Sequence, residues 1–203
     1  MLLAFDTSSS ACTAALFDGS GECVARKDEL IGRGHSERLV PMLDELLDGR
    51  SADHILVGVG PGSFTGIRVA IAAAHGLAIG WAAELSGMSS LALLAAGAPN
   101  DSEVGVAIIG GHGELFVRQF DGLTGGPKTD LRNLAPSDAA EIITAPLVVG
   151  SGAKALVDAR GWGEAREAWP CAADVLRLPA AMRSLPPKPV YARAPDAKIR
   201  EAA

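Results

Sequence analysis

The segment that most restricts the fold of this chain is the run ILVGVGPGSFTGIRVAIAAAHGLA, residues 55–78. An apolar, strand-like run ends in a glycine-rich turn, and a helical pattern of small residues follows at once. Proteins commonly hold phosphate groups with a strand, a glycine loop and a helix in this order. The segment therefore predicts an α/β fold that carries a phosphate-binding loop or a loop inherited from one.

The glycine loop matches neither common phosphate-binding signature. A Walker loop needs a lysine directly after its second glycine, and no pair of glycines here provides that pattern. In the dinucleotide fingerprint GxGxxG the third glycine would fall one residue earlier than Gly66. Two interpretations stay open: a plain strand-to-helix turn whose glycines supply positive φ, or a loop that faces or once faced phosphate. The residues of the second interpretation are Gly60, Gly62, Ser63 and Gly66.

A second candidate for phosphate contact is the turn Asp6-Thr7-Ser8, which directly follows the first apolar strand. In nucleotide-binding folds an acid at this place orients a metal or a water, and hydroxyls and turn amides hold oxyanions. An Asx-type turn that only closes a hairpin fits the same residues.

Composition restricts the class of partner and the compartment. A net charge of −6 argues against the chain binding nucleic acid by itself, because nucleic-acid-binding proteins usually present a basic surface. The three cysteines, which are far apart and form no CxxC pair, are expected to be reduced thiols of a cytoplasmic protein. The weakly polar stretch 69–83 is short and rich in alanine, so we expect no membrane span.

Catalytic and metal-binding motifs are hard to place in this chain. Its four histidines do not stand at metal-ligand spacing, and the GxSxG nucleophile elbow is missing. We therefore expect no metal site and no catalytic residue.

The chain is predicted to consist of two lobes, residues 1–98 and 99–203, that each begin with a β-hairpin. The recurrence of a hairpin at 104–120 suggests an internal duplication. A leucine-rich helical stripe marks the helix 35–48, and the glycine loop leads into a second helix at 63–82. The second lobe ends in a proline-rich tail.

The run GPGSFTGIRVAIAAAHGLA resembles the signature loop and helix of the bacterial TsaB (YeaZ) family, which acts in tRNA threonylcarbamoyladenosine biosynthesis. LLAFDTSSSACTAAL at the start, HSERLVPMLDELL in the first helix and PVYAR near the end support the resemblance. It is close over residues 1–96 and looser over 104–193. One departure is Gly110-Gly111-His112, where the family usually has an Asp-Ala-Arg-type turn.

The resemblance implies duplicated actin/Hsp70-ATPase-like (ribonuclease H-like) lobes, with mixed sheets flanked by helices. It implies a non-catalytic partner of TsaD, the enzyme that transfers a threonylcarbamoyl group to an adenosine beside the anticodon of tRNAs, with the ATPase TsaE assisting. The segment GMSSLALLAAG lacks the histidine metal ligands that TsaD-like proteins carry after this loop and helix. The resemblance thus implies no tightly bound cofactor, ATP only at the TsaD–TsaB–TsaE complex, and tRNA only through that complex.

The two helices of the first lobe are predicted to form the partner surface. A helix that is apolar all round must be covered on more than one side, and small side chains let a second helix approach closely. The alternative is that both helices simply pack on each other and on the sheet. Without TsaD, a weak homodimer through the same surface is expected. The predicted interface residues are Leu39, Met42, Leu46, Ile71, Ala73, Ala74, Leu77 and Ala78.

Two other functions remain as alternatives: a stand-alone ATPase or peptidase of the same fold, and a homodimer with an unrelated binding role.

Overall fold

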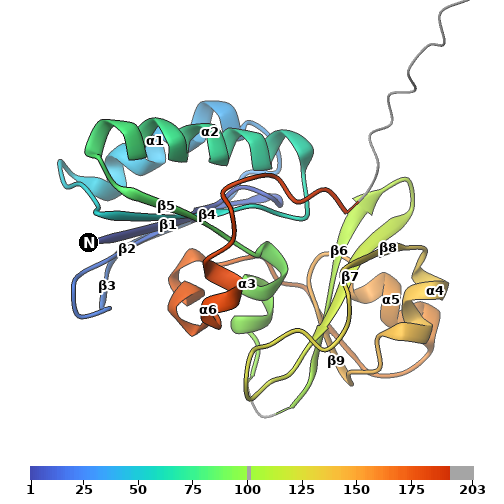
Figure 1. Cartoon of the computed structure of the whole chain (residues 1–203). Coiled ribbons are helices and arrows are strands. Elements are labelled where there is room, and N and C mark those ends of the chain that lie inside the picture. Colours follow the sequence, from blue (N-terminus) through green and yellow to red (C-terminus); the bar gives the residue numbers. More distant parts are fainter. Residues whose placement is uncertain (100–101, 193–203) are drawn as a thin grey trace, which may run out of the picture.

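The computed structural model describes residues 1–99 and 102–192 and shows five alternating layers of helix and sheet (Figure 1). Helices α1 (His35–Leu47) and α2 (Phe64–Trp81) cover the outer face of the first sheet, and α4 (Pro136–Ile142) and α5 (Ala153–Arg160) cover the outer face of the second. Helices α3 (Ser90–Ala96) and α6 (Ala180–Arg183) lie between the two sheets (Figure 1). The predicted proline-rich tail spans residues 186–203; its residues 193–203, and residues 100–101 of the connection between lobes, lie outside the described residues.

The first sheet has the strand order β3-β2-β1-β4-β5. Its central strand β1 pairs antiparallel with β2 and parallel with β4, so the sheet is mixed. Strands β1 and β2 lie within the apolar runs of the predicted N-terminal hairpin. Strand β2 is buried along its whole length because both of its faces are covered. The elements of this lobe are β1 Leu2–Asp6, β2 Ala11–Phe17, β3 Cys23–Leu30, α1 His35–Leu47, β4 His54–Gly58, α2 Phe64–Trp81, β5 Glu84–Met88 and α3 Ser90–Ala96.

The second sheet repeats this arrangement. Its order β10-β9-β6-β7-β8 places three antiparallel strands beside two parallel ones, as in the first sheet. This repetition confirms the predicted duplicated α/β lobes, with mixed sheets flanked by helices. The elements are β6 Val104–Gly111, β7 Glu114–Phe120, β8 Arg132–Leu134, α4 Pro136–Ile142, β9 Leu147–Val149, α5 Ala153–Arg160 and β10 Glu164–Arg166, followed by the 3₁₀ helix η1 Ala172–Arg177 and α6 Ala180–Arg183.

A single apolar core joins the two lobes. It contains the inner faces of both sheets, for example Leu56 of β4 and Phe120 of β7, together with the apolar residues of α3 and η1. Burial of such a continuous surface is the main favourable term in folding. The two lobes are therefore expected to unfold together. A second core lies between the first sheet and the helices α1 and α2.

The end of the chain returns to the first lobe as an extended segment, residues 184–191, which we call the C-terminal strap. Leu185 exchanges backbone hydrogen bonds with Gly87 of β5, with N–O distances of 2.6 and 3.0 Å, and Val190 N donates to Val59 O at 2.8 Å. A Cβ at Gly87 would lie 2.7 Å from Pro186 O, so a glycine is needed for the strap to lie this close. The strap, assigned to the second lobe by its sequence position, packs on the first (Figure 1, red segment).

Replacing Phe120 by alanine tests whether the core unites the lobes. Phe120 is fully buried, so Phe120→Ala should cost about 3 to 5 kcal/mol of unfolding free energy. Urea unfolding followed by circular dichroism and by tryptophan fluorescence should show one transition at the same midpoint. Leu123→Ala, at a side chain that is 86% exposed, is the control and should change stability little. Two separate transitions in the wild type would contradict a shared core.

Candidate functional site

The two candidate phosphate loops lie side by side at one edge of the first sheet. The turn Asp6–Ser8 follows β1, and the glycine loop, residues 59–63, follows β4. Because β1 and β4 are parallel neighbours, both loops leave the sheet at its carboxyl edge. Ser63 ends the loop as the N-cap of α2, and its side chain accepts a hydrogen bond from Gly66 N at 3.2 Å.

Asp6 is a fully buried carboxylate whose two oxygens both accept hydrogen bonds from neutral groups. Its Oδ1 accepts from the amide and the hydroxyl of Ser8, each at 2.7 Å. Its Oδ2 accepts from Ser90 Oγ at 2.5 Å, and that hydroxyl also accepts from Gly60 N at 3.2 Å. Because burial of a carboxylate is costly unless it is hydrogen bonded, these bonds are what allow Asp6 to lie here. Asp6 thereby connects the first turn, α3 and the glycine loop.

The glycine loop and the residues that flank it lie directly against the Asp6–Ser8 turn because three positions have no side chain. A Cβ at Gly58 would lie 1.9 Å from Asp6 Oδ2, and one at Gly66 would lie 1.9 Å from Thr7 O. A Cβ at Gly62 would lie 2.1 Å from Ser8 O. A side chain at any of these three positions would therefore collide with the first turn.

Two hydrogen bonds close the contact between the loops. Ser63 N donates to Ser8 O, and Thr7 Oγ1 donates to Gly66 O, both at 2.7 Å. Gly60 contributes in another way, since its φ of 97° lies in the region that favours glycine. The structure thus brings together all seven residues predicted as a phosphate site, and here they hold one another: Asp6, Thr7, Ser8, Gly60, Gly62, Ser63 and Gly66.

The predicted partner surface needs a correction. Five of its eight residues are buried in the core between the first sheet and the two helices, so their side chains cannot contact a partner directly. The physical reason is that the apolar stripes of α1 and α2 turn toward the sheet and toward each other. The buried five are Leu39, Met42, Leu46, Ile71 and Ala74; Ala73, Leu77 and Ala78 are partly exposed.

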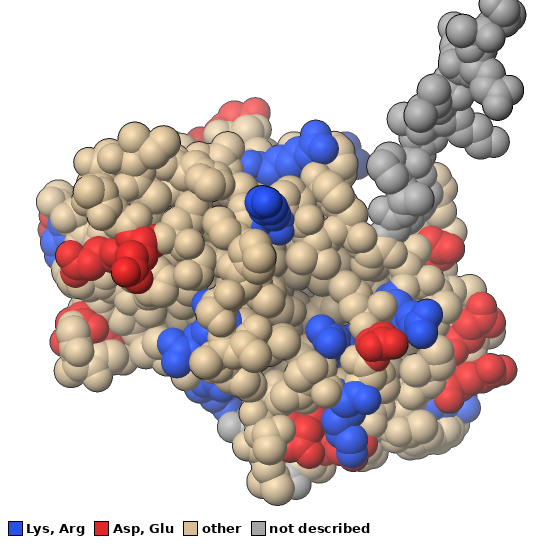
Figure 2. All heavy atoms as spheres, viewed as in Figure 1, with Lys and Arg blue, Asp and Glu red and all other residues tan. Residues whose placement is uncertain are grey.

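The outer side of α2 is nevertheless apolar and open to solvent. Ile79 is 83% exposed, and Ala72, Gly76 and Gly80 near it are exposed and small, with the exposed His75 one turn away. Between α1 and α2 lies a groove of about 540 Å³. Figure 2 shows few charged side chains over α2. The groove is lined by Val40, Leu43, Asp44, Leu47, Gly49, Arg50, Ala73, Gly76, Leu77 and Trp81.

Helix α2 is also long and apolar enough, by length and composition alone, to cross a membrane. Its residues Gly66, Ile67, Ala70, Ile71 and Ala74 are instead buried in the first lobe. The apolar composition of α2 is therefore explained by its role as a core helix, one side of which packs on the first sheet.

Within residues 1–99 and 102–192, no three side chains of His, Cys, Asp or Glu come close enough to hold a metal ion. The thiol of Cys12 is buried, and this burial raises its pKa to about 11, so it is not a reactive thiolate near neutral pH.

Sequence reasoning missed Ser90 and Tyr191. Ser90 is the partner of Asp6, and its signal is weak: it follows the helix cap Ser89 in a short Ser-Ser pair. Tyr191 contacts the first turn of α2 from the end of the described chain, accepting a hydrogen bond from Arg68.

Comparison with known proteins agrees with this fold. A family model described as TsaD, tRNA N6-adenosine threonylcarbamoyltransferase, matches residues 28–129. The solved structure of YeaZ from Pseudomonas aeruginosa superimposes with a TM-score of 0.77 and 30% identity, over 94% of this chain and 98% of that one. The chain belongs to the TsaB (YeaZ) family.

Two further comparisons support the assignment to the TsaB family. The tRNA threonylcarbamoyladenosine biosynthesis protein TsaB of Escherichia coli is 36% identical over 142 residues. That alignment covers 64% of this chain and 60% of the E. coli protein, so it spans less than two thirds of the relative. A second structure, described as an uncharacterized protein with similarity to peptidase YEAZ from P. aeruginosa, has a TM-score of 0.80 and 30% identity, over 95% of this chain and 99% of that one.

Two glycines of α2 test whether close packing of the loops holds the site together. Gly66→Ala places a methyl group against Thr7 O and should lower the unfolding free energy by about 1 to 3 kcal/mol. Gly76→Ala is the matched control, because a Cβ there has no neighbour within 4 Å. It should raise stability by up to about 1 kcal/mol through helix propensity. If urea unfolding shows that the two substitutions change the free energy of unfolding equally, the loops are not tightly packed.

Proposed function

We propose that this chain is a non-catalytic partner of a TsaD-like protein, in the formation of the threonylcarbamoyl group on adenosine next to the anticodon of tRNAs. Membership of the TsaB family supports the pathway, and the E. coli relative carries this pathway in its name. The match of residues 28–129 to the TsaD family model supports a partner of related fold, since related lobes present similar helices to each other.

The observation that carries the partner role is the exposed apolar side of α2. A helix of a monomeric protein usually turns polar residues to solvent, whereas beyond Arg68 the exposed residues of α2 are apolar or small except for His75. A contiguous apolar surface of this kind marks a binding surface. Small side chains would allow a partner helix to approach α2 closely, and the groove between α1 and α2 would receive a larger side chain.

The contact between the two loops supports a non-catalytic role. The carboxylate at the end of β1 accepts hydrogen bonds from Ser8 and Ser90, and the glycine loop rests on the turn that would otherwise face a phosphate. We propose that ATP enters the system only at the complex with the TsaD-like and TsaE-like proteins. With a net charge of −6, this chain would meet tRNA through that complex. We further propose a cytoplasmic location, in keeping with three free cysteines.

A stand-alone peptidase is the second candidate, and one observation favours it: the similar P. aeruginosa structure is described by its similarity to a peptidase. The loop geometry disfavours it, because the acid at the strand end is enclosed and bonded to serines and the glycine loop.

Glutamate substitutions on α2 test the partner role. Ala73→Glu and Ile79→Glu place a charge on a surface that would be buried in the complex, while both side chains are exposed enough for the monomer to stay folded. Calorimetric titration with the TsaD-like protein of the same organism should show at least a hundredfold weaker binding, about 2.7 kcal/mol. The weak homodimer, measured by sedimentation, should be lost as well.

The control for these substitutions is Leu123→Glu, at an equally exposed aliphatic residue of the second lobe. It should bind the partner like the wild type. If both α2 variants bind normally while remaining folded, α2 is not the docking surface.

A further inference from the structure

The C-terminal strap delivers an aromatic side chain to the first turn of α2. Tyr191 stacks on Phe64 with ring centroids 5.4 Å apart, and its hydroxyl accepts a hydrogen bond from Arg68 Nε at 2.9 Å. The Arg68 guanidinium lies 3.7 Å from the centre of the Phe64 ring. Three residues from two distant parts of the sequence thus form one cluster, which we call the aromatic–arginine cluster.

The cluster is held in place by the backbone on both sides. Phe64 and Arg68 belong to α2, whose start is fixed by the Ser63 cap and by the glycine contacts. On the other side, Val190 N donates to Val59 O, which anchors the strap one residue before Tyr191. A Cβ at Gly60 would meet Val190 O at 3.3 Å and Ile67 Cδ1 at 2.5 Å, so the glycine loop also makes room for the strap.

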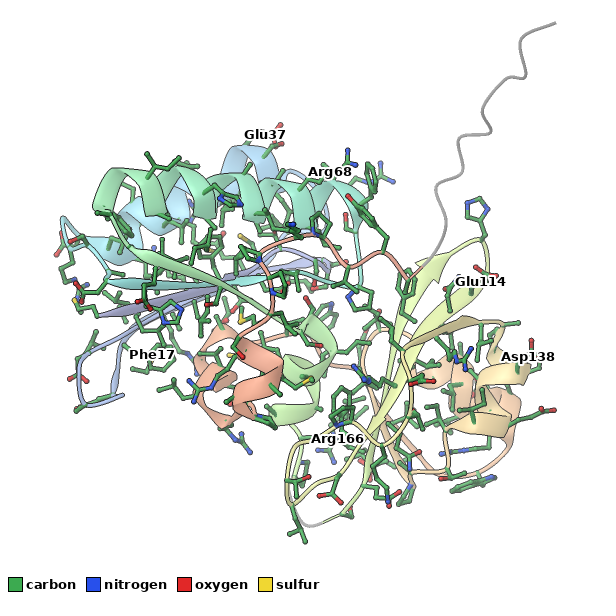
Figure 3. The ribbon with its side chains drawn as sticks, viewed as in Figure 1. Phe17, Glu37, Arg68, Glu114, Asp138 and Arg166 are labelled. Atoms are coloured by element: carbon green, nitrogen blue, oxygen red, sulfur yellow. The ribbon has the colours of Figure 1, made fainter. Side chains whose placement is uncertain are left out.

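The cluster lies on the same side of α2 as the exposed apolar residues. Phe64, Arg68, Ala72, His75 and Ile79 are spaced four, four, three and four residues apart, which places them along one ridge of the helix. All five are exposed. Figure 3 shows Arg68 at the end of α2 that is nearer the strap.

The cluster exposes aromatic surface and an arginine that could still contact another molecule. Phe64 is 51% exposed and Tyr191 is 44% exposed, although burying aromatic surface is favourable. Among the described residues no carboxylate pairs with Arg68, whose recorded contacts are the Tyr191 hydroxyl and the two rings. Arginine and tyrosine are over-represented among the residues that dominate binding energy, and side chains that are already ordered lose little entropy on binding.

We propose that the aromatic–arginine cluster is the anchor of the docking surface on α2, and that the C-terminal strap is therefore part of that surface. This inference rests on the proposed partner role. The occupant is the TsaD-like partner, which would place an apolar side chain on the exposed ring surface of Phe64 and Tyr191. A carboxylate of the partner would pair with the N–H groups of the Arg68 guanidinium that Tyr191 leaves unbonded; Arg68 is the one Lys, Arg, Asp or Glu residue of this helix.

Affinity for the TsaD-like protein measures the contribution of the anchor. Tyr191→Ala and Arg68→Ala should each weaken binding at least about tenfold, as expected for anchor residues. Tyr191→Phe keeps the stacked ring but not the acceptor of the Arg68 hydrogen bond, so its loss should be smaller, about threefold. Because the Arg68 contact is ionic, the wild type should bind more weakly as salt rises, and Arg68→Ala should show a reduced dependence on salt.

Trp162→Ala provides a matched control in the second lobe. Trp162 is 50% exposed and lies under the Arg160 guanidinium at 3.6 Å, so the chemistry is the same at a place away from α2. It should not change partner affinity.

The outcomes separate this inference from the proposed function. If the wild type binds and Tyr191→Ala and Arg68→Ala bind as well as Trp162→Ala, the anchor is refuted and the partner role stands. If the wild type shows no binding, the partner role fails and the anchor with it. If Tyr191→Ala lowers thermal stability, the affinities of Arg68→Ala and Tyr191→Phe test the anchor instead. Arg68→Ala alters an exposed side chain, and Tyr191→Phe keeps the ring, so both variants should stay folded.

Discussion

The rest of the first lobe depends on a close approach of β4 and α2 to the Asp6–Ser8 turn that only glycine permits. Gly58, Gly62 and Gly66 face Asp6, Ser8 and Thr7 at distances that no side chain could occupy. This contact fixes the direction in which the chain leaves β4, and with it the start of α2. It also leaves Asp6 enclosed among hydroxyls and amides, so its carboxylate joins the first turn, α3 and the glycine loop in one junction. The C-terminal strap uses the same junction, because Val190 bonds to Val59 at its edge.

Once the start of α2 is fixed, the rest of the helix divides into two sides with different tasks. Ile67, Ala70 and Ala74 pack toward the first sheet, while the ridge from Phe64 to Ile79 stays in solvent. The central core holds both sheets together through α3 and η1, so neither lobe needs α2 to contact the other. The outer side of α2 is therefore free to bind another protein. A helix ridge that is apolar apart from Arg68 and His75 supports the proposed binding role.

Much of the fold could be predicted from the sequence because its signals are local. Apolar runs and the glycine loop located β1, β4 and α2, and the second hairpin revealed the duplication. The orientation of α2 is hard to predict, since most of its residues are alanine, glycine or aliphatic and give little periodic signal; the prediction thus places Ala74 on the surface although it is buried. The bonds of Asp6 to Ser90 and of Arg68 to Tyr191 join residues 84 and 123 positions apart, and no local pattern encodes contacts of that range.

Hydrogen–deuterium exchange of this chain, alone and with the TsaD-like protein, measures most directly whether the loop junction is scaffold and α2 the docking surface. The amides of α2 and of the C-terminal strap should exchange more slowly in the complex, because docking covers them and suppresses local opening. The turn Asp6–Ser8, already buried in the free chain, should change little. Slower exchange confined to α4 and α5 of the second lobe, with α2 unchanged, would contradict this account.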